Sequence, residues 1–222
     1  RFTRSLSLPQ LCVLATTTTQ QEMSSTPQVQ ILDPSASALL DENAVASNVG
    51  QQKQFGFTEG PVWVAETTSW IFSDIPKNKQ FKYDTKHGAL EVFRMDSDNG
   101  NGNFLDTEGR LLTCEHKSRV LSRIDLKTGE REVLASEWQG KKLTSPNDVI
   151  ASRLNGDIYF TDPDYGTIPM LGHGEESEQE NQNVFRIDGS TGDLSVVTSD
   201  FVRPNGLCFS PDEKLMYIAD SG

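Results

Sequence analysis

The chain has 222 residues, of which 32 are acidic and 20 are basic, and its formal charge at pH 7 is −12. This balance argues against a nucleic-acid-binding surface, because such a surface needs clustered lysine and arginine. No apolar run approaches the roughly 20 residues that a membrane-spanning helix requires, so we expect a soluble protein. The cysteines are Cys12, Cys114 and Cys208, an odd number without a Cys-x-x-Cys pair. Cys114 and Cys208 fall in expected strands, where buried free thiols and a reducing compartment are favoured.

Residues 1–50 differ in composition from the rest, and we predict that they form a low-complexity, disordered segment. Up to Gln30 the segment is rich in serine and threonine and contains a single acid, Glu22. Such a composition is typical of organellar targeting sequences, but it also fits a plain tail or a mis-annotated start upstream of Met23. The interpretation favours a cytoplasmic location and leaves organellar targeting open.

Residues 51–222 contain four copies of one pattern. Each copy opens with a side chain that can bind a metal through oxygen, continues into an apolar strand, turns, and closes a second apolar strand with a polar residue. The offset from the opening to the closing residue is 15 in every copy, and the pairs are Glu59 with Asp74, Asn101 with His116, Asn147 with Asp162, and Asn205 with Asp220. A constant internal spacing with variable gaps between copies indicates a repeated supersecondary element.

The repeat predicts an all-β fold. Successive copies are 42, 46 and 58 residues apart, the size of a β-propeller blade of about four strands. In the first copy we expect strands over residues 61–65, 70–73, 79–84 and 89–93, separated by turn-forming clusters. Residues 55–222 then hold about three and a half blades. Because a propeller needs at least about four blades to close, we expect a partial β-propeller over 51–222, incomplete at the C-terminus.

The opening residues are candidates for a metal site. The first two strands of a blade are antiparallel neighbours, so the start of one and the end of the other lie at the same face. The four opening residues should therefore surround the central channel, with the closing residues further out. One carboxylate among several amide oxygens suits a hard divalent cation, above all Ca²⁺. Asn-Gly and Asn-Asp are also common turn residues before a strand, and this structural alternative stays open.

Several motifs resemble the gluconolactonase/regucalcin (senescence marker protein) family, and its gluconolactonase branch most closely. In chain order they are Phe57-Thr-Glu-Gly-Pro-Val-Trp, Gly109-Arg-Leu-Leu-Thr-Cys-Glu-His, Ser145-Pro-Asn-Asp-Val-Ile, Tyr159-Phe-Thr-Asp-Pro-Asp-Tyr-Gly and Arg203-Pro-Asn-Gly-Leu-Cys-Phe-Ser-Pro-Asp-Glu. The resemblance covers roughly residues 55–222. It implies a six-bladed propeller with one divalent cation at its centre, Ca²⁺ or alternatively Zn²⁺ or Mg²⁺, and lactone hydrolysis as the activity.

The resemblance also implies roles for individual residues. Glu59, Asn147 and Asn205 would be metal ligands, with Asn147 alternatively a contact to substrate or water beside the metal. Asp148 would line the substrate pocket. The family's catalytic Asp, the remaining ligand, lies about one blade after a Pro-Asn-Gly motif, and here that position falls beyond Gly222. We therefore expect no catalytic residue within the chain, and we expect the chain alone to be inactive.

Two residues of the second copy complete the expected substrate pocket. Asn101 occupies the opening position, and His116 is the only histidine in a repeat-equivalent position. His116 could be a pocket wall or proton shuttle, or simply a hydrogen-bonded histidine at the end of a strand. The acidic stretch 167–183, between the second and third strands of the third blade, could be a lid or a solvated loop.

The expected reaction is the opening of a lactone or sugar-acid lactone, in which the cation polarises the carbonyl and water attacks. No Gly-x-Ser-x-Gly motif offers a serine nucleophile. Two alternatives use the same fold: a phosphotriesterase-like or other ester hydrolase, and a non-catalytic calcium-binding propeller. The expected partner is a small molecule, and the sequence sets no oligomeric state.

Overall fold

The computed structural model describes residues 34–38, 48–49 and 55–222 and divides the chain into two units, residues 1–51 and 52–222. The described part of the first unit contains a short 3-10 helix, η1 (Pro34–Ala38). The rest of the low-complexity segment predicted over 1–50 lies outside the described residues, as does Cys12. Within the described ranges, no helix is long and apolar enough to cross a membrane.

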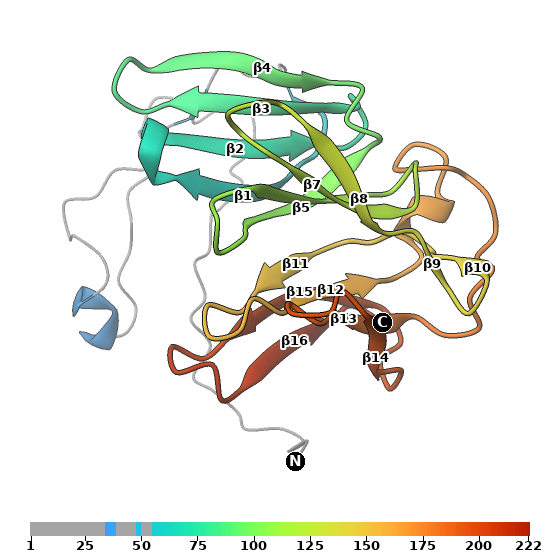
Figure 1. Cartoon of the computed structure of the whole chain (residues 1–222). Coiled ribbons are helices and arrows are strands. Elements are labelled where there is room, and N and C mark those ends of the chain that lie inside the picture. Colours follow the sequence, from blue (N-terminus) through green and yellow to red (C-terminus); the bar gives the residue numbers. More distant parts are fainter. Residues whose placement is uncertain (1–33, 39–47, 50–54) are drawn as a thin grey trace. The chain divides into compact units, whose positions relative to one another are not determined.

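The second unit consists of antiparallel sheets in which strands that are consecutive in sequence pair with each other (Figure 1). The first sheet contains β1 (Thr58–Val64), β2 (Ser69–Asp74), β3 (Lys79–Asp84) and β4 (Ala89–Met95). The second contains β5 (Gly100–Leu105), β6 (Leu111–Glu115), β7 (Val120–Ile124) and β8 (Arg131–Ala135). The third contains β11 (Val149–Ala151), β12 (Ile158–Asp162), β13 (Asn183–Ile187) and β14 (Leu194–Thr198). A last pair is formed by β15 (Pro204–Phe209) and β16 (Met216–Asp220).

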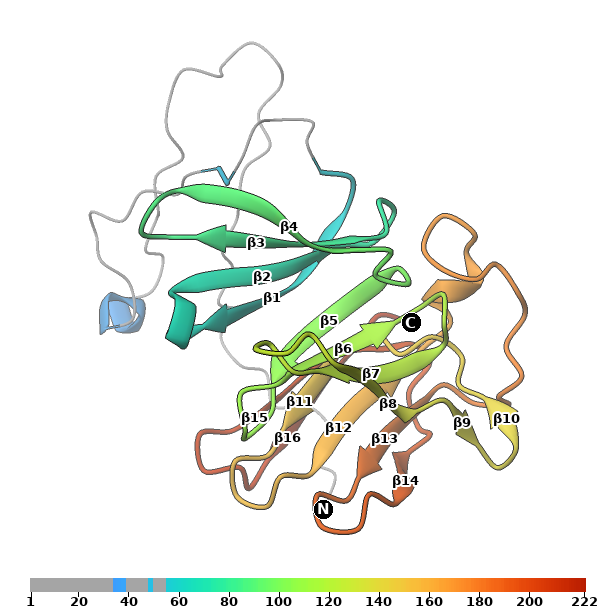
Figure 2. The same ribbon diagram turned by 45° about the horizontal axis from the view of Figure 1, so that its top comes forward.

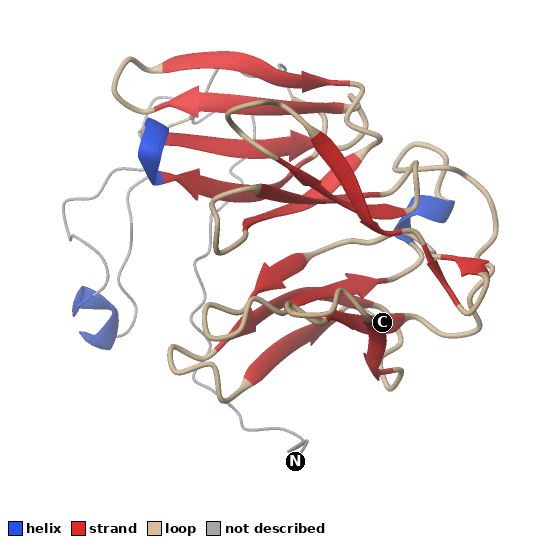
Figure 3. Ribbon diagram, viewed as in Figure 1, coloured by secondary structure: helices blue, strands red, loops and turns tan. Residues whose placement is uncertain are grey.

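These sheets confirm the predicted fold class: three four-stranded propeller blades and the inner hairpin of a fourth. Figure 2 shows the sheets following one another in chain order. A small hairpin, β9 (Glu137–Trp138) and β10 (Lys141–Lys142), connects the second blade to the third. Among the described residues of this unit, helical structure is limited to the 3-10 turns η2 (Ala65–Thr67) and η3 (Tyr165–Thr167) (Figure 3).

The outer hairpins of the second and third blades are closed by the same local chemistry. The Asp125 carboxylate accepts hydrogen bonds from the backbone N–H groups of the two residues 127 and 128, and Gly129 follows with φ +75°. Asp188 accepts from residues 190 and 191 in the same way, followed by Gly192 at φ +78°. Glycine adopts this left-handed conformation without the steric cost of a Cβ. The Thr-Gly pairs at 128–129 and 191–192 therefore form the tight turns of these two hairpins.

Apolar side chains from facing blades form two cores. Between the first and second blades lie Val64, Ile71, Leu111 and Ile124. The larger core lies between the second and third blades, where the rings of Phe160 and Phe185 stack with centroids 5.2 Å apart. This core holds the blades in their relative positions by burying apolar area.

The two described cysteines differ in their environment. Cys114 is buried in the larger core, as predicted. Cys208 lies in a strand, β15, but its side chain is exposed, so the predicted burial is wrong. The neighbouring Leu207 is buried, and successive side chains of a strand point to opposite faces.

Candidate functional site

The inner strands β1, β5 and β15 each begin with a β-bulge, and the opening residue of the repeat lies at that bulge. In β1, positions 59 and 62 pair with positions 73 and 71 of β2, so three steps on one strand oppose two on the other. The same irregularity occurs between 100 and 103 in β5 and between 204 and 207 in β15. A bulge bends its strand and re-aims a side chain. Glu59, Asn101 and Asn205 thus depart from the regular alternation at the edge where the blades meet.

Hydrogen bonds join the strand starts of the first three blades. The side-chain amide of Asn103 donates to the carbonyl oxygen of Gly60 at 2.9 Å. The backbone N–H of Gly102 donates to the carbonyl oxygen of Asn147 at 2.8 Å. A Cβ on Gly102 would lie 2.7 Å from the Cα of Asp148, so this approach requires glycine. The starts of the first, second and third blades are consequently neighbours.

The third and fourth blades are joined in a similar way. The Thr161 hydroxyl donates to the carbonyl oxygen of Asn205 at 2.9 Å and accepts from the backbone N–H of Asp148 at 3.1 Å. The Asp148 carboxylate accepts from the backbone N–H of Leu207 at 3.1 Å. The structure therefore brings the four opening residues and Asp148 to adjoining strand starts.

Two carboxylates, Glu59 and Asp148, lie at this junction. Burial raises the pKa of Glu59, and the nearby charge of Asp148 raises it further. Burial also raises the pKa of Asp148, against the opposing effect of the backbone N–H groups of Leu207 and Val149. Two partly desolvated carboxylates that repel each other favour either a proton or a bound cation. The electrostatics of the junction thus suit a cation.

The amide side chains leave oxygen atoms available at the same place. Asn147 is only 5% exposed, yet its side chain makes no hydrogen bond to any residue in the described ranges. The Nδ2 of Asn205 donates to the Tyr165 hydroxyl at 3.3 Å, which leaves its Oδ1 without a donor among the described residues. Solvent reaches the polar atoms of the Asn147 amide, so they can bind a ligand in place of water.

Tyr165 was missed by the sequence analysis. It lies in η3, directly after β12, and its ring also lies beneath the Arg203 guanidinium at 5.1 Å. The available signal was the Asp-Tyr-Gly that follows Asp162 in one of the quoted motifs. A residue directly after an inner strand reaches the same face as the end of that strand.

Three of the four closing residues, Asp74, Asp162 and Asp220, share one structural role. Each carboxylate accepts hydrogen bonds from two consecutive backbone N–H groups just before the inner strand of its own blade. The donors are Gly56 and Phe57 for Asp74, Thr144 and Ser145 for Asp162, and Val202 and Arg203 for Asp220. We call this arrangement the aspartate clamp. It fixes the path of the chain into each inner strand and engages both oxygens of each carboxylate.

The second blade has His116 where the others have the clamp. His116 is fully buried, with Nδ1 2.9 Å from the Leu171 carbonyl oxygen and Nε2 3.1 Å from Nδ2 of Asn101. A carbonyl oxygen only accepts, so Nδ1 carries the proton and Nε2 accepts from Asn101. This assignment directs the Asn101 nitrogen toward His116 and leaves its oxygen free of that contact. Burial lowers the pKa of His116 to about 4, which keeps the ring neutral.

The loop between β12 and β13, residues 163–182, is docked onto the blades. His173 Nε2 lies 2.9 Å from the Thr144 carbonyl oxygen, and the backbone N–H of Gly166 donates to Ser145 Oγ at 2.8 Å. With the bond from His116, these contacts tie the first half of the loop to the strand starts of the second and third blades. This half is a fixed wall of the site.

The acidic half of the same loop is bound as well. The buried Arg119 guanidinium pairs with Glu178 at 3.1 Å and with Glu175 at 3.5 Å. Lys141 pairs with Glu180 at 3.1 Å. The acidic side chains nevertheless stay largely exposed, with Glu175 at 67% and Glu180 at 84%, so this half fits the solvated alternative while ion pairs hold it in place.

The donor set determines which metal the site would suit. Among the described residues, no group of three or more His, Cys, Asp or Glu side chains is arranged to hold a metal ion. The predicted set is of another kind, because it combines the Glu59 carboxylate with the amide oxygens of Asn147 and Asn205. Oxygen ligands of this type suit a hard cation such as Ca²⁺ or Mg²⁺. The partnerless amide of Asn147 and the raised pKa of Glu59 fit that group.

An all-β protein of propeller blades, with a polar ring where the inner strands begin, is the class that fold and site define. The family model of the SMP-30/Gluconolactonase/LRE-like region matches residues 57–222, and the chain belongs to this family. A gluconolactonase of Zymomonas mobilis is 30% identical over 201 residues, which cover 85% of this chain and 55% of that protein. Lactonohydrolase oryL of Aspergillus oryzae is 32% identical over 102 residues, 46% of this chain and 23% of that protein.

Solved structures support this family assignment. A gluconolactonase from Xanthomonas campestris superposes with a TM-score of 0.71 at 32% identity, over 76% of this chain and 55% of that one. Regucalcin from Agrobacterium tumefaciens, a calcium-binding protein, gives a TM-score of 0.58 at 17% identity, over 75% and 51% of the two chains, and shares the fold. The chain thus spans about half the length of the bacterial gluconolactonases and of regucalcin.

Proposed function

We propose that this protein is a metal-dependent hydrolase that opens a lactone, with a sugar-acid lactone as the substrate class. The observation that carries the proposal is the Asn147 amide, which makes no hydrogen bond to any described residue and lies at the junction shared with Glu59 and Asp148. Relatives at 30–32% identity that are named gluconolactonase support the reaction class.

In this proposal Glu59, Asn147 and Asn205 hold the cation. Ca²⁺ suits these oxygen ligands best, with Mg²⁺ or Zn²⁺ as alternatives. A cation bound there would polarise the lactone carbonyl and stabilise the oxyanion that forms on attack by water. Glu59 contributes the formal negative charge of the set, and its pKa is raised by burial and then by the nearby charge of Asp148.

The substrate contacts are assigned to Asp148 and Asn101. The Asn101 amide is held with its nitrogen on His116, so its oxygen can accept a hydrogen bond from a substrate hydroxyl. His116 has both ring nitrogens engaged within the protein, so we assign it a positioning role and no proton transfer. We assign the base for the attacking water to the Asp that the family resemblance places after residue 222.

The test is Glu59→Gln in the intact protein, which removes the charge and keeps the size of the side chain. Ca²⁺ affinity measured by calorimetry should fall by roughly tenfold or more, and metal-dependent δ-lactone opening should fall with it. His116→Ala should weaken Ca²⁺ binding less, and the exposed Glu66→Gln serves as the charge-matched control. Equal affinity of Glu59→Gln and the parent would refute the ligand assignment.

A second measurement separates the reaction class from the site. Lactone opening that persists after chelation would exclude the metal-dependent mechanism. Ca²⁺ binding without turnover of any lactone would identify a non-catalytic calcium-binding propeller. Turnover restricted to phosphotriesters would leave the site in place and replace the substrate.

A further inference from the structure

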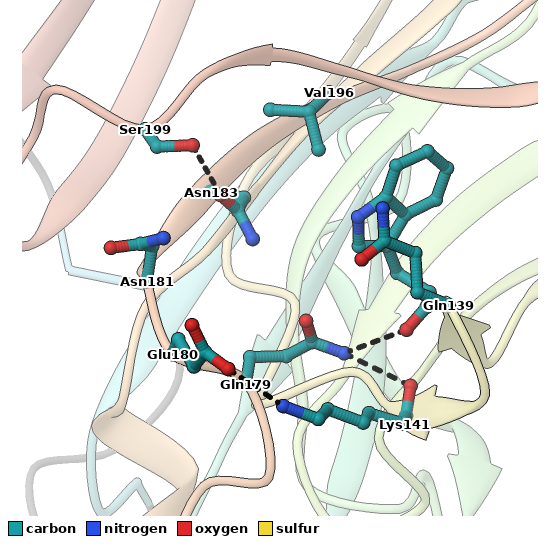
Figure 4. Close-up of a pocket in the computed structure, with 9 residues that line it drawn as sticks. Gln139, Lys141, Gln179, Glu180, Asn181, Asn183, Val196 and Ser199 are labelled. Carbon is teal, nitrogen blue, oxygen red and sulfur yellow. Dashed lines mark hydrogen bonds and ion pairs between the residues drawn. The ribbon is translucent and has the colours of Figure 1, made fainter.

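A pocket of about 320 Å³ lies at the outer strands of the third blade, apart from the ring of opening residues (Figure 4). Its lining comes from the β9–β10 hairpin, the end of the 163–182 loop and β14. The size is at the lower end of the range for small-ligand pockets. The residues that line it belong to the connecting β9–β10 hairpin and to the third blade, whose four strands are all present.

The pocket is preformed by one glutamine. The Nε2 of Gln179 donates to the carbonyl oxygens of Trp138 at 3.3 Å, Lys141 at 2.9 Å and Lys142 at 3.0 Å. The Lys141–Glu180 ion pair at 3.1 Å adds a second link between the hairpin and the loop. The hairpin backbone is therefore fixed against the loop before any ligand binds.

Asn183 supplies the observation that points to a ligand. The side chain is 5% exposed, and its Oδ1 accepts a hydrogen bond from Ser199 Oγ at 2.7 Å. The other side-chain atom, Nδ2, makes no hydrogen bond to any described residue and is directed into the pocket (Figure 4). Solvent reaches Nδ2 within the pocket, so an oxygen atom of a ligand can accept its hydrogen bond in place of water.

The remaining lining defines the chemistry of that ligand. Trp138 is half-buried and packs edge-on against Phe185, with ring centroids 5.9 Å apart, so the indole is held rigidly beside Val196. Exposed amides of Gln139 and Asn181 stand on the rim. An indole surface stacks on the C–H face of a sugar ring, while amides bond to its hydroxyls.

Charge narrows the class further. The one cation of the lining, Lys141, is already paired with Glu180, so no free positive charge awaits an anion. The chain as a whole carries −12 and repels anions. We propose that this pocket binds an uncharged, hydroxyl-rich ring of hexopyranose size. The proposal is independent of the lactone-hydrolase function, because none of its residues belongs to the ring of opening residues.

The test follows the Asn183 side-chain amide and the Trp138 indole N–H by NMR while D-glucose is added to the intact protein. Saturable shifts at both groups are expected. Asn183→Asp keeps an acceptor for Ser199 and removes the donor, so the affinity should fall roughly tenfold, with lactone opening unchanged. Gln182→Glu is the matched control, because it adds the same charge next door and keeps the acceptor for the Asp164 N–H.

Three outcomes would overturn the proposal. They are the absence of saturable shifts, an affinity of Asn183→Asp equal to that of the parent, and binding of the open-chain polyol sorbitol as tight as that of the sugar ring. D-gluconate tests the charge argument, since binding stronger than that of glucose would also contradict it. If Asn183→Asp fails to fold, Gln139→Ala on the exposed rim replaces it, with an expected loss of roughly threefold.

Discussion

The second and third blades have different residues at the closing position of the repeat, and these residues have different roles. In the third blade, Asp162 accepts hydrogen bonds from the backbone N–H groups of Thr144 and Ser145, which fixes the chain before the inner strand. In the second blade, His116 stands in that position and is bonded to the side chain of Asn101 instead. One residue position thus serves the scaffold in one blade and orients a candidate site residue in the other.

The second blade does not need an aspartate clamp, because residues of the first blade hold the segment before its inner strand, β5. The backbone N–H of Asn99 donates to Asn78 Oδ1 at 2.8 Å, and Asn99 Nδ2 donates to the Ile75 carbonyl oxygen at 2.7 Å. With the backbone satisfied, position 116 is free for another role. The comparison teaches that a residue that departs from a structural repeat, as His116 departs from the aspartates, is the one to examine for function.

The largest effect is expected where the clamp is broken in the core. Asp162→Ala leaves the N–H groups of Thr144 and Ser145 buried and without an acceptor, and should lower the free energy of unfolding by about 4 kcal/mol. Burial raises the pKa of Asp162 to about 7, so the urea denaturation should be measured above that pH, where the carboxylate is ionised. Asp220→Ala removes an exposed clamp, and its loss should be much smaller. Equal losses would show that the clamp is not what stabilises these strand starts.

The second prediction concerns His116 and the pH dependence of the free energy of unfolding. The folded-state pKa of His116 is about 4, below the 6.5 of a solvent-exposed imidazole, because burial disfavours the charged ring. As pH falls through this window the unfolded chain takes up the proton and the folded chain does not, so stability present above pH 6.5 is lost. The 2.5-unit difference corresponds to about 3 kcal/mol.

Urea denaturation of the parent and of His116→Gln across this window measures the effect as the difference between the two proteins, because Asp162, whose pKa burial raises to about 7, titrates in the same window with the opposite sign in both. The stability of the parent relative to the variant should fall as pH falls. His87 is the control of opposite sign, because its hydrogen bond to Asp84 raises its pKa and its contribution is lost as pH rises. A parent and a His116→Gln variant with parallel pH profiles would contradict the buried neutral assignment.

The blades could be predicted from the sequence because the pairing of their inner strands follows a short, constant spacing along the chain. The constant offset of 15 links each closing residue to a position next to its partner in the hairpin: Asp74 pairs with Thr58, beside Glu59, and Asp220 pairs with Pro204, beside Asn205. Both pairings are local hairpins, whose register depends on neighbouring residues and turn length. The opening residues could be found for the same reason.

The remaining features depend on contacts between distant residues. His116 meets Leu171, which is 55 residues away, so the docking of the 163–182 loop could not be read from either segment alone. The predicted burial of Cys208 was wrong for a related reason. A strand pattern predicts that side chains alternate between two faces, but the neighbouring sheet decides which face is buried. The role of Tyr165 likewise appears only where β15 lies beside η3.

The smallest expected effect distinguishes two glycines at equivalent positions of the repeat. Gly102 and Gly206 both follow the opening asparagine of a repeat. A Cβ on Gly102 would lie 2.6 Å from the Asn147 carbonyl oxygen and 2.7 Å from the Asp148 Cα, and backbone atoms there cannot give way easily. On Gly206 the nearest atom would be the Asp148 Oδ2 at 3.7 Å, an ordinary contact.

Gly102→Ala should therefore lower the free energy of unfolding by about 2 kcal/mol, whereas Gly206→Ala should stay within about 0.5 kcal/mol of the parent. Urea denaturation of the two variants measures the difference, and the Ca²⁺ affinity of the proposed site provides a second readout. Because Gly102 bonds to Asn147, a displaced strand start should also weaken cation binding in Gly102→Ala. If both alanine variants match the parent in stability and affinity, the close approach of β5 and β11 does not position the ring, and the site must be held by the aspartate clamp alone.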